Sequence, residues 1–166
     1  MVGVHRRTAA IIGLACLAVG ALASSAPGQD QSAATAKDVI FARKTVMSSL
    51  SDAMDRIETM LESGKINLAA GNADADTISV FLMAFPHLFP PSSNQWKPNA
   101  DLDPATDTFA SPDVWTKYSD FYQQSASAAK AADEARQATN DAEFKAAIGK
   151  LRLECNGCHA LYLKAQ

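Results

Sequence analysis

The spacing of apolar residues is the feature that most constrains the fold of this 166-residue chain. Over residues 35–63 the bulky apolar side chains recur every three or four positions, which places them on one side of an α-helix. These residues are Ile40, Met47, Leu50, Met54, Ile57 and Leu61. Gly64 comes next and favours the end of the helix there.

Three further helices are expected downstream. A less regular helix spans residues 69–85, and Pro86 ends it because proline lacks the backbone donor that a helix interior needs. The next spans residues 111–139 and begins at Ser111, which caps the helix while the following proline takes the first helical position. The last begins at Asn140 or Asp141, and its apolar face consists of Phe144, Ile148, Leu151, Cys155, Cys158 and Tyr162.

The fold class follows from these four amphipathic stretches. Beyond the amino-terminal region, no segment alternates between apolar and polar residues in the way that a half-buried strand does. Four such helices without strands predict an all-α protein, an antiparallel four-helix bundle. The connection over residues 86–111 is rich in Pro, Asn, Asp and Ser and is unusually long, so we expect it to wrap over one end of the bundle.

The amino-terminal residues have the layout of a secretory signal peptide. Arg6 and Arg7 precede an uncharged apolar run over residues 8–22, and Ala21-Leu22-Ala23 offers a small-residue cleavage site. We therefore expect a cleaved signal over residues 1–23, a flexible segment over 24–34, a four-helix domain over 35–166 and a periplasmic protein. The alternative is an uncleaved anchor, but the apolar run is shorter than the ~20 residues of a spanning helix.

The charge of the chain limits its partners. The formal net charge is −3, and removal of the two arginines with the signal makes the mature chain more acidic. An acidic surface argues against nucleic acid or an anionic membrane as the main partner. The third cysteine, Cys16, lies within the apolar run and is lost with the signal, which leaves only Cys155 and Cys158.

The sequence Cys155-Asn156-Gly157-Cys158-His159 is a haem-attachment motif. Two cysteines three positions apart on a helix direct their sulfurs to the same side, so each can add to one vinyl group of a haem. The histidine that follows is then placed as the proximal iron ligand. A redox dithiol would need a βαβ unit, and a zinc site would need further ligands, neither of which the sequence offers. The motif predicts one covalent haem c.

The sixth iron ligand must come from upstream, because only seven residues follow His159. The mature chain offers Met47, Met54, Met60, Met83 and His87. A methionine at helical spacing is by default core filler, and a histidine beside prolines is by default a surface residue.

The position of Arg43 favours Met47 among these candidate iron ligands. Arg43 interrupts the apolar stripe of the first helix, where an unpaired cation would be costly unless it bound an anionic haem propionate. Met47, one turn further on, would then face the iron opposite His159. Alternatively, a small helix rotation exposes Arg43 to solvent.

The chain resembles the class II c-type cytochromes, which include the cytochrome c prime proteins and their low-spin relatives. The resemblance covers essentially the whole mature chain. Its motifs are the carboxy-terminal C-x-x-C-H followed by Tyr162, Asp38-Val39 with Arg43 and Met47, Arg56-Ile57, Phe85-Pro86-His87-Leu88-Phe89-Pro90-Pro91, and Ser111-Pro112-Asp113-Val114-Trp115. One departure is Leu163, with Lys164 next, where the family commonly has a basic residue directly after the aromatic.

The resemblance implies a periplasmic four-helix bundle around one haem, often a homodimer, and leaves two functions open. In the cytochrome c prime proteins an apolar residue at the position of Met47 shields a five-coordinate iron that binds nitric oxide or carbon monoxide. In the low-spin relatives the matching methionine ligates the iron of an electron carrier. Arg43 is more typical of the first group, whereas Met47 and Leu88-Phe89-Pro90 favour the second.

We predict a non-enzymatic carrier that exchanges single electrons with periplasmic redox proteins, with Met47 as sixth ligand. A gas-binding cytochrome is the alternative. A weaker third hypothesis is a haem-free helical binding module in which Cys155 and Cys158 form a disulfide.

Overall fold

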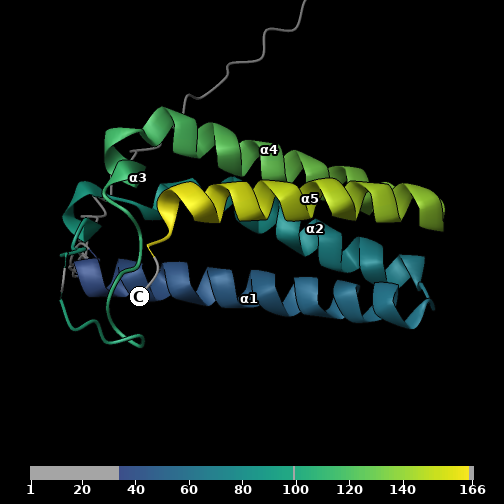
Figure 1. The fold of residues 1–166 in the computed structure, drawn as a ribbon, viewed down its shortest axis with the longest axis horizontal. Coiled ribbons are helices and arrows are strands. Elements are labelled where there is room, and N and C mark those ends of the chain that lie inside the picture. The colour runs from purple at the N-terminus through teal and green to yellow at the C-terminus, as the bar shows by residue number, and fades with distance from the viewer. Residues whose placement is uncertain (1–33, 99, 165–166) are drawn as a thin grey trace, which may run out of the picture. The chain divides into compact units, whose positions relative to one another are not determined.

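Four long helices in an antiparallel arrangement make up most of the protein (Figure 1). The computed structural model describes residues 34–98 and 100–164, so the predicted signal peptide lies outside the described residues. The long helices are α1 (Ala36–Ser63), α2 (Leu68–Ala84), α4 (Tyr118–Arg136) and α5 (Asp141–Tyr162). The described residues form no named strand, and an isolated bridge between Ala110 and Leu163 is their only β pairing. The predicted all-α four-helix bundle is confirmed.

Local signals fix the ends of α1. Thr35 and Asp38 form a reciprocal capping box, in which each side chain accepts a hydrogen bond from the backbone N–H of the other. At the other end Gly64 has φ +68°, and its N–H donates to the carbonyl of Leu61. Glycine takes this left-handed conformation without a Cβ clash, which explains why the helix stops where the sequence predicts.

The third predicted helix is interrupted. Helix α3 (Asp113–Thr116) has Pro112 at its N-cap, one residue later than predicted, and Ser111 Oγ accepts a hydrogen bond from the N–H of Asp113. Lys117 then leaves the helical region with φ −122° and ψ 40°, and α4 begins after it. The indole of Trp115 donates to the carbonyls of Phe89 and Pro90, so α3 is anchored to the preceding loop. A periodicity argument cannot detect such a long-range contact.

The connection after α2 also contains short helical turns. The 3₁₀ turns η1 (Phe85–Leu88) and η2 (Pro91–Ser93) each have a proline near their first position, where a missing N–H costs nothing. The rest of the connection passes over one end of the bundle before α3 (Figure 1), as predicted from its length.

Packing of the bundle is uneven around its circumference. Helix α1 packs along α2, α2 along α4, and α4 along α5, whereas α1 and α5 have no comparable contact. Gly71 of α2 faces the buried ring of Phe144 of α5, and an added Cβ would lie 2.6 Å from that ring. No helix among the described residues is long and apolar enough to cross a membrane.

Candidate functional site

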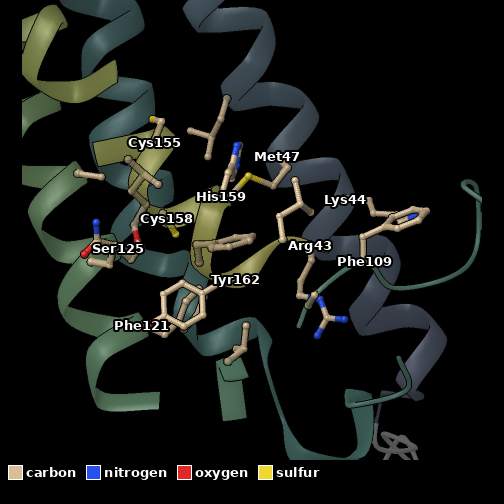
Figure 2. A pocket seen from close by; sticks show the side chains of 18 of the residues that line it. Arg43, Lys44, Met47, Phe109, Phe121, Ser125, Cys155, Cys158, His159 and Tyr162 are labelled. Atoms are coloured by element: carbon tan, nitrogen blue, oxygen red, sulfur yellow. The ribbon is translucent and has the colours of Figure 1, made fainter. Parts of the chain in front are cut away.

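A cavity of ≈ 340 Å³ lies where α1 and α5 fail to pack, and its walls are mostly apolar. The walls come from α1, α2, α4, α5 and residues 108–110 of the long connection. Figure 2 shows that α5 supplies Cys155, Cys158 and His159 and that α1 supplies Arg43 and Met47. The structure therefore brings all five predicted site residues to one cavity, although more than a hundred positions separate the two groups in sequence.

The cysteines lie on the inward side of the last turns of α5, half-buried and not bonded to each other. Burial raises the pKa of the Cys155 thiol, and burial together with the neighbouring Cys155 and Glu154 raises that of Cys158 to about 11. Both groups are therefore neutral thiols at pH 7. Raised pKa values argue against a redox dithiol, whose reactive form is a thiolate.

In residues 34–98 and 100–164, no group of three or more His, Cys, Asp and Glu side chains is arranged so that it could hold a metal ion. The histidine of the motif, His159, is exposed at the cavity margin. Figure 2 shows its ring and the Met47 side chain projecting into the same part of the cavity from α5 and α1.

The other candidate iron ligands differ in whether they line the cavity. Met54 also lines the cavity, two turns beyond Met47 on the same face of α1. Met60 and Met83 do not line it, and His87 is exposed and lies against the ring of Tyr122 instead. Among the described residues, Met47 and Met54 are therefore the two methionines whose thioethers can approach a group held in this cavity.

Arg43 is 4% exposed, so the alternative of a solvent-facing arginine is wrong. Its Nη1 donates to Ser93 Oγ at 2.8 Å and its Nη2 to Thr108 Oγ1 at 3.0 Å, while the guanidinium carbon lies 4.4 Å from the centre of the Phe89 ring. A third, longer bond of 3.4 Å runs from Nη1 to the carbonyl of Leu88.

All of these partners of Arg43 are neutral. No carboxylate in the described part of the chain pairs with this cation, and burial lowers its pKa to about 10. The guanidinium is directed away from His159 (Figure 2), and Nε donates to none of the described residues. A buried cation without a counter-ion at the wall of a cavity fits a cofactor that carries carboxylates. Its pairing with a haem propionate stays a prediction.

These residues fit a haem c. Cys155 and Cys158 would hold the macrocycle through thioether bonds, His159 would bind the iron, and apolar walls would enclose the ring. A four-helix bundle with this motif at the cavity end of its last helix defines a c-type cytochrome of the four-helix class.

The family is shown by direct comparison. The family profile described as Cytochrome C' matches residues 38–162, which is most of the chain. The chain therefore belongs to the cytochrome c' family, and the prediction of one covalent haem c is confirmed. No curated protein sequence matches the chain significantly.

Solved structures agree with this assignment. Cytochrome c' from Rhodopseudomonas palustris matches with a TM-score of 0.67 and 28% identity, over 78% of this chain and 98% of that one. A cytochrome c' described by its unusual ligand-controlled dimer dissociation matches at 0.69 and 19%, over 81% and 100%. The nitric oxide complex of a mutant cytochrome c prime from Alcaligenes xylosoxidans matches at 0.66 and 17%, over 81% and 100%.

Sequence reasoning missed the partners of Arg43. Ser93 and Thr108 lie 50 and 65 positions from it, and both are buried in the connection that the sequence marks only as a long loop. Serine and threonine are ordinary in loops, so nothing local distinguishes these two. Their buried positions arise only when the connection folds over α1.

Proposed function

We propose that the protein binds a diatomic gas, nitric oxide or carbon monoxide, at an open sixth position of its haem iron. This reverses the order of the two functions that the sequence suggested. Membership of the cytochrome c' family supports it, together with the likeness to a cytochrome c prime whose nitric oxide complex is known. When bound, the haem supplies gas coordination at its iron.

The packing of Met47 is the observation that carries this proposal. Met47 is half-buried and packs against both hydrophobic clusters of the core, one around Ile57 and Phe144 and the other around Phe89 and Phe121. We infer that a thioether packed in this way acts as an apolar shield over the cavity. Met47 in this role keeps water and bulky ligands away and leaves room for a small gas.

The roles of the other residues follow from their places in the cavity. His159 would hold the iron from α5, and thioether bonds to Cys155 and Cys158 would fix the macrocycle against that helix. Arg43 places a positive charge at the wall, where it would offset the charge of a propionate. None of these residues forms a nucleophile–base pair, and we propose no catalysis on an organic substrate.

The ferric spectrum and a Met47→Leu variant test the proposal. We expect a high-spin ferric spectrum without a sulfur-to-iron charge-transfer band, and carbon monoxide binding to the ferrous protein. Leucine has a similar volume and apolar character, so the spectrum of the variant should be almost unchanged.

The competing function is electron transfer with Met47 as sixth ligand, which its place opposite His159 in the cavity favours. A charge-transfer band in the native protein that disappears in Met47→Leu, with carbon monoxide binding only in the variant, would establish that function instead. One-electron exchange with periplasmic redox proteins then becomes the role.

We also propose a periplasmic homodimer. The amino-terminal signal supports export. The packed pair α1 and α2 exposes Phe41 at 69%, Val80 at 58% and Met83 at 52%, and burial of such side chains against a second copy would remove apolar area from water. A similar cytochrome c' is described by the dissociation of its dimer.

A further inference from the structure

Ion pairs cross every seam of the bundle. Each long helix contributes two charged residues at positions i and i+2, which point about 200° apart and so face the two neighbouring helices. The four pairs are Arg56–Asp74 at 2.6 Å, Asp76–Arg136 at 3.5 Å, Glu134–Lys150 at 2.8 Å and Arg152–Glu58 at 2.7 Å. They join α1 to α2, α2 to α4, α4 to α5 and α5 back to α1, and so form a closed ring.

The Arg152–Glu58 pair differs from the others because of the seam it crosses. The other three pairs reinforce helices that already pack closely, whereas α1 and α5 have no comparable contact. Arg152 donates from both Nε, at 3.0 Å, and Nη2, at 2.7 Å, to the same oxygen of Glu58. Among the described residues it is the one ion pair between α1 and α5, the helices that carry Met47 and His159.

The pair stands at one end of the cavity. Glu58 lies three helical turns beyond Met47, and Arg152 lies two turns before His159. At the opposite end, residues 104–111 tie the same two helices together. Lys44 donates to the carbonyl of Pro104, and the N–H groups of Ser111 and Lys164 bond across to Tyr162 and Phe109. Contacts at both ends of the cavity therefore link α1 to α5.

We propose that Arg152 and Glu58 are positioning residues that hold α1 against the haem on α5 and so limit access of a ligand to the iron. Met47 belongs to α1, so the separation of α1 and α5 sets the distance between Met47 and a haem held on α5. The effect on gas entry rests on the proposed function, but the control of helix separation does not. Arg152 and Glu58 act through α1 and do not touch the haem site themselves.

The expected effect is modest. The two side chains are 49% and 36% exposed, so water and salt weaken their attraction. Loss of one exposed pair changes an opening equilibrium by a factor of about two to five. Carbon monoxide should therefore associate about two- to fivefold faster with the Glu58→Gln variant, and added salt should speed the native protein but not the variant.

The experiment uses the haem-bound protein with a matched control. Glu134→Gln removes the Lys150 pair between α4 and α5, with a glutamate of similar exposure, 40%. Hydrogen exchange of the amides over residues 43–54 reports the motion of α1 whether or not a gas binds. We expect faster exchange and faster carbon monoxide association in Glu58→Gln but not in Glu134→Gln, and native behaviour restored by the charge-reversed Glu58→Arg, Arg152→Glu double variant.

The outcomes separate the two proposals. Equal effects of Glu58→Gln and Glu134→Gln, or no restoration by charge reversal, would overturn the positioning role even if carbon monoxide binds. Selective exchange in α1 without any carbon monoxide binding by the native protein would support the positioning role and overturn the proposed function.

Discussion

Gly71 offers a sharp test of the bundle, because the structure predicts stability changes of opposite sign for Gly71→Ala and for the same substitution at Gly149. Replacing a helical glycine with alanine normally stabilises a helix by about 0.8–1 kcal/mol. At Gly71, however, the new Cβ would lie 2.6 Å from Cζ of Phe144, whose ring is completely buried. Overpacking of a filled core costs about 1–3 kcal/mol, so Gly71→Ala should destabilise the protein by up to about 2 kcal/mol.

Gly149 provides the control within the same bundle. It lies in α5 with nothing within 4 Å of an added Cβ, so Gly149→Ala should keep the full helix gain. The helix term cancels between the two variants, and their unfolding free energies should differ by about 1–3 kcal/mol. Urea unfolding followed by circular dichroism measures this difference. Equal stabilisation by both alanines would refute the close contact between Gly71 and the Phe144 ring.

Two further changes test the site and the assembly. Arg43→Met should lower the reduction potential of the haem, because a buried cation at the cavity wall favours the less positive ferrous state. Lys44→Met, at the more exposed rim of the cavity, should shift the potential less. Equal shifts of the two variants in a potentiometric titration would contradict a special role for the buried charge. Phe41→Glu should convert the proposed dimer to a monomer in sedimentation velocity, because burying a carboxylate against a second apolar face costs free energy. An unchanged molecular mass of the assembly would place any interface elsewhere.

Much of this protein is determined within short stretches of its sequence. Thr35 and Asp38 begin α1, Gly64 ends it, and Asn140 begins α5 by accepting a hydrogen bond from the N–H of Glu143. The haem motif likewise lies within five consecutive residues. Such signals are visible in the sequence because each interaction joins residues no more than four positions apart.

The tertiary structure decides which distant residues complete these local elements. Arg43 finds Ser93 and Thr108, α3 is anchored through Trp115 and ends at Lys117, and Arg152 meets Glu58 94 positions away. Polar and charged residues of these types occur throughout surfaces and loops, so no sequence pattern marks the pairs in advance. Which of these residues meet is determined by how the helices pack and by the cavity between α1 and α5, and this packing depends on the whole folded chain.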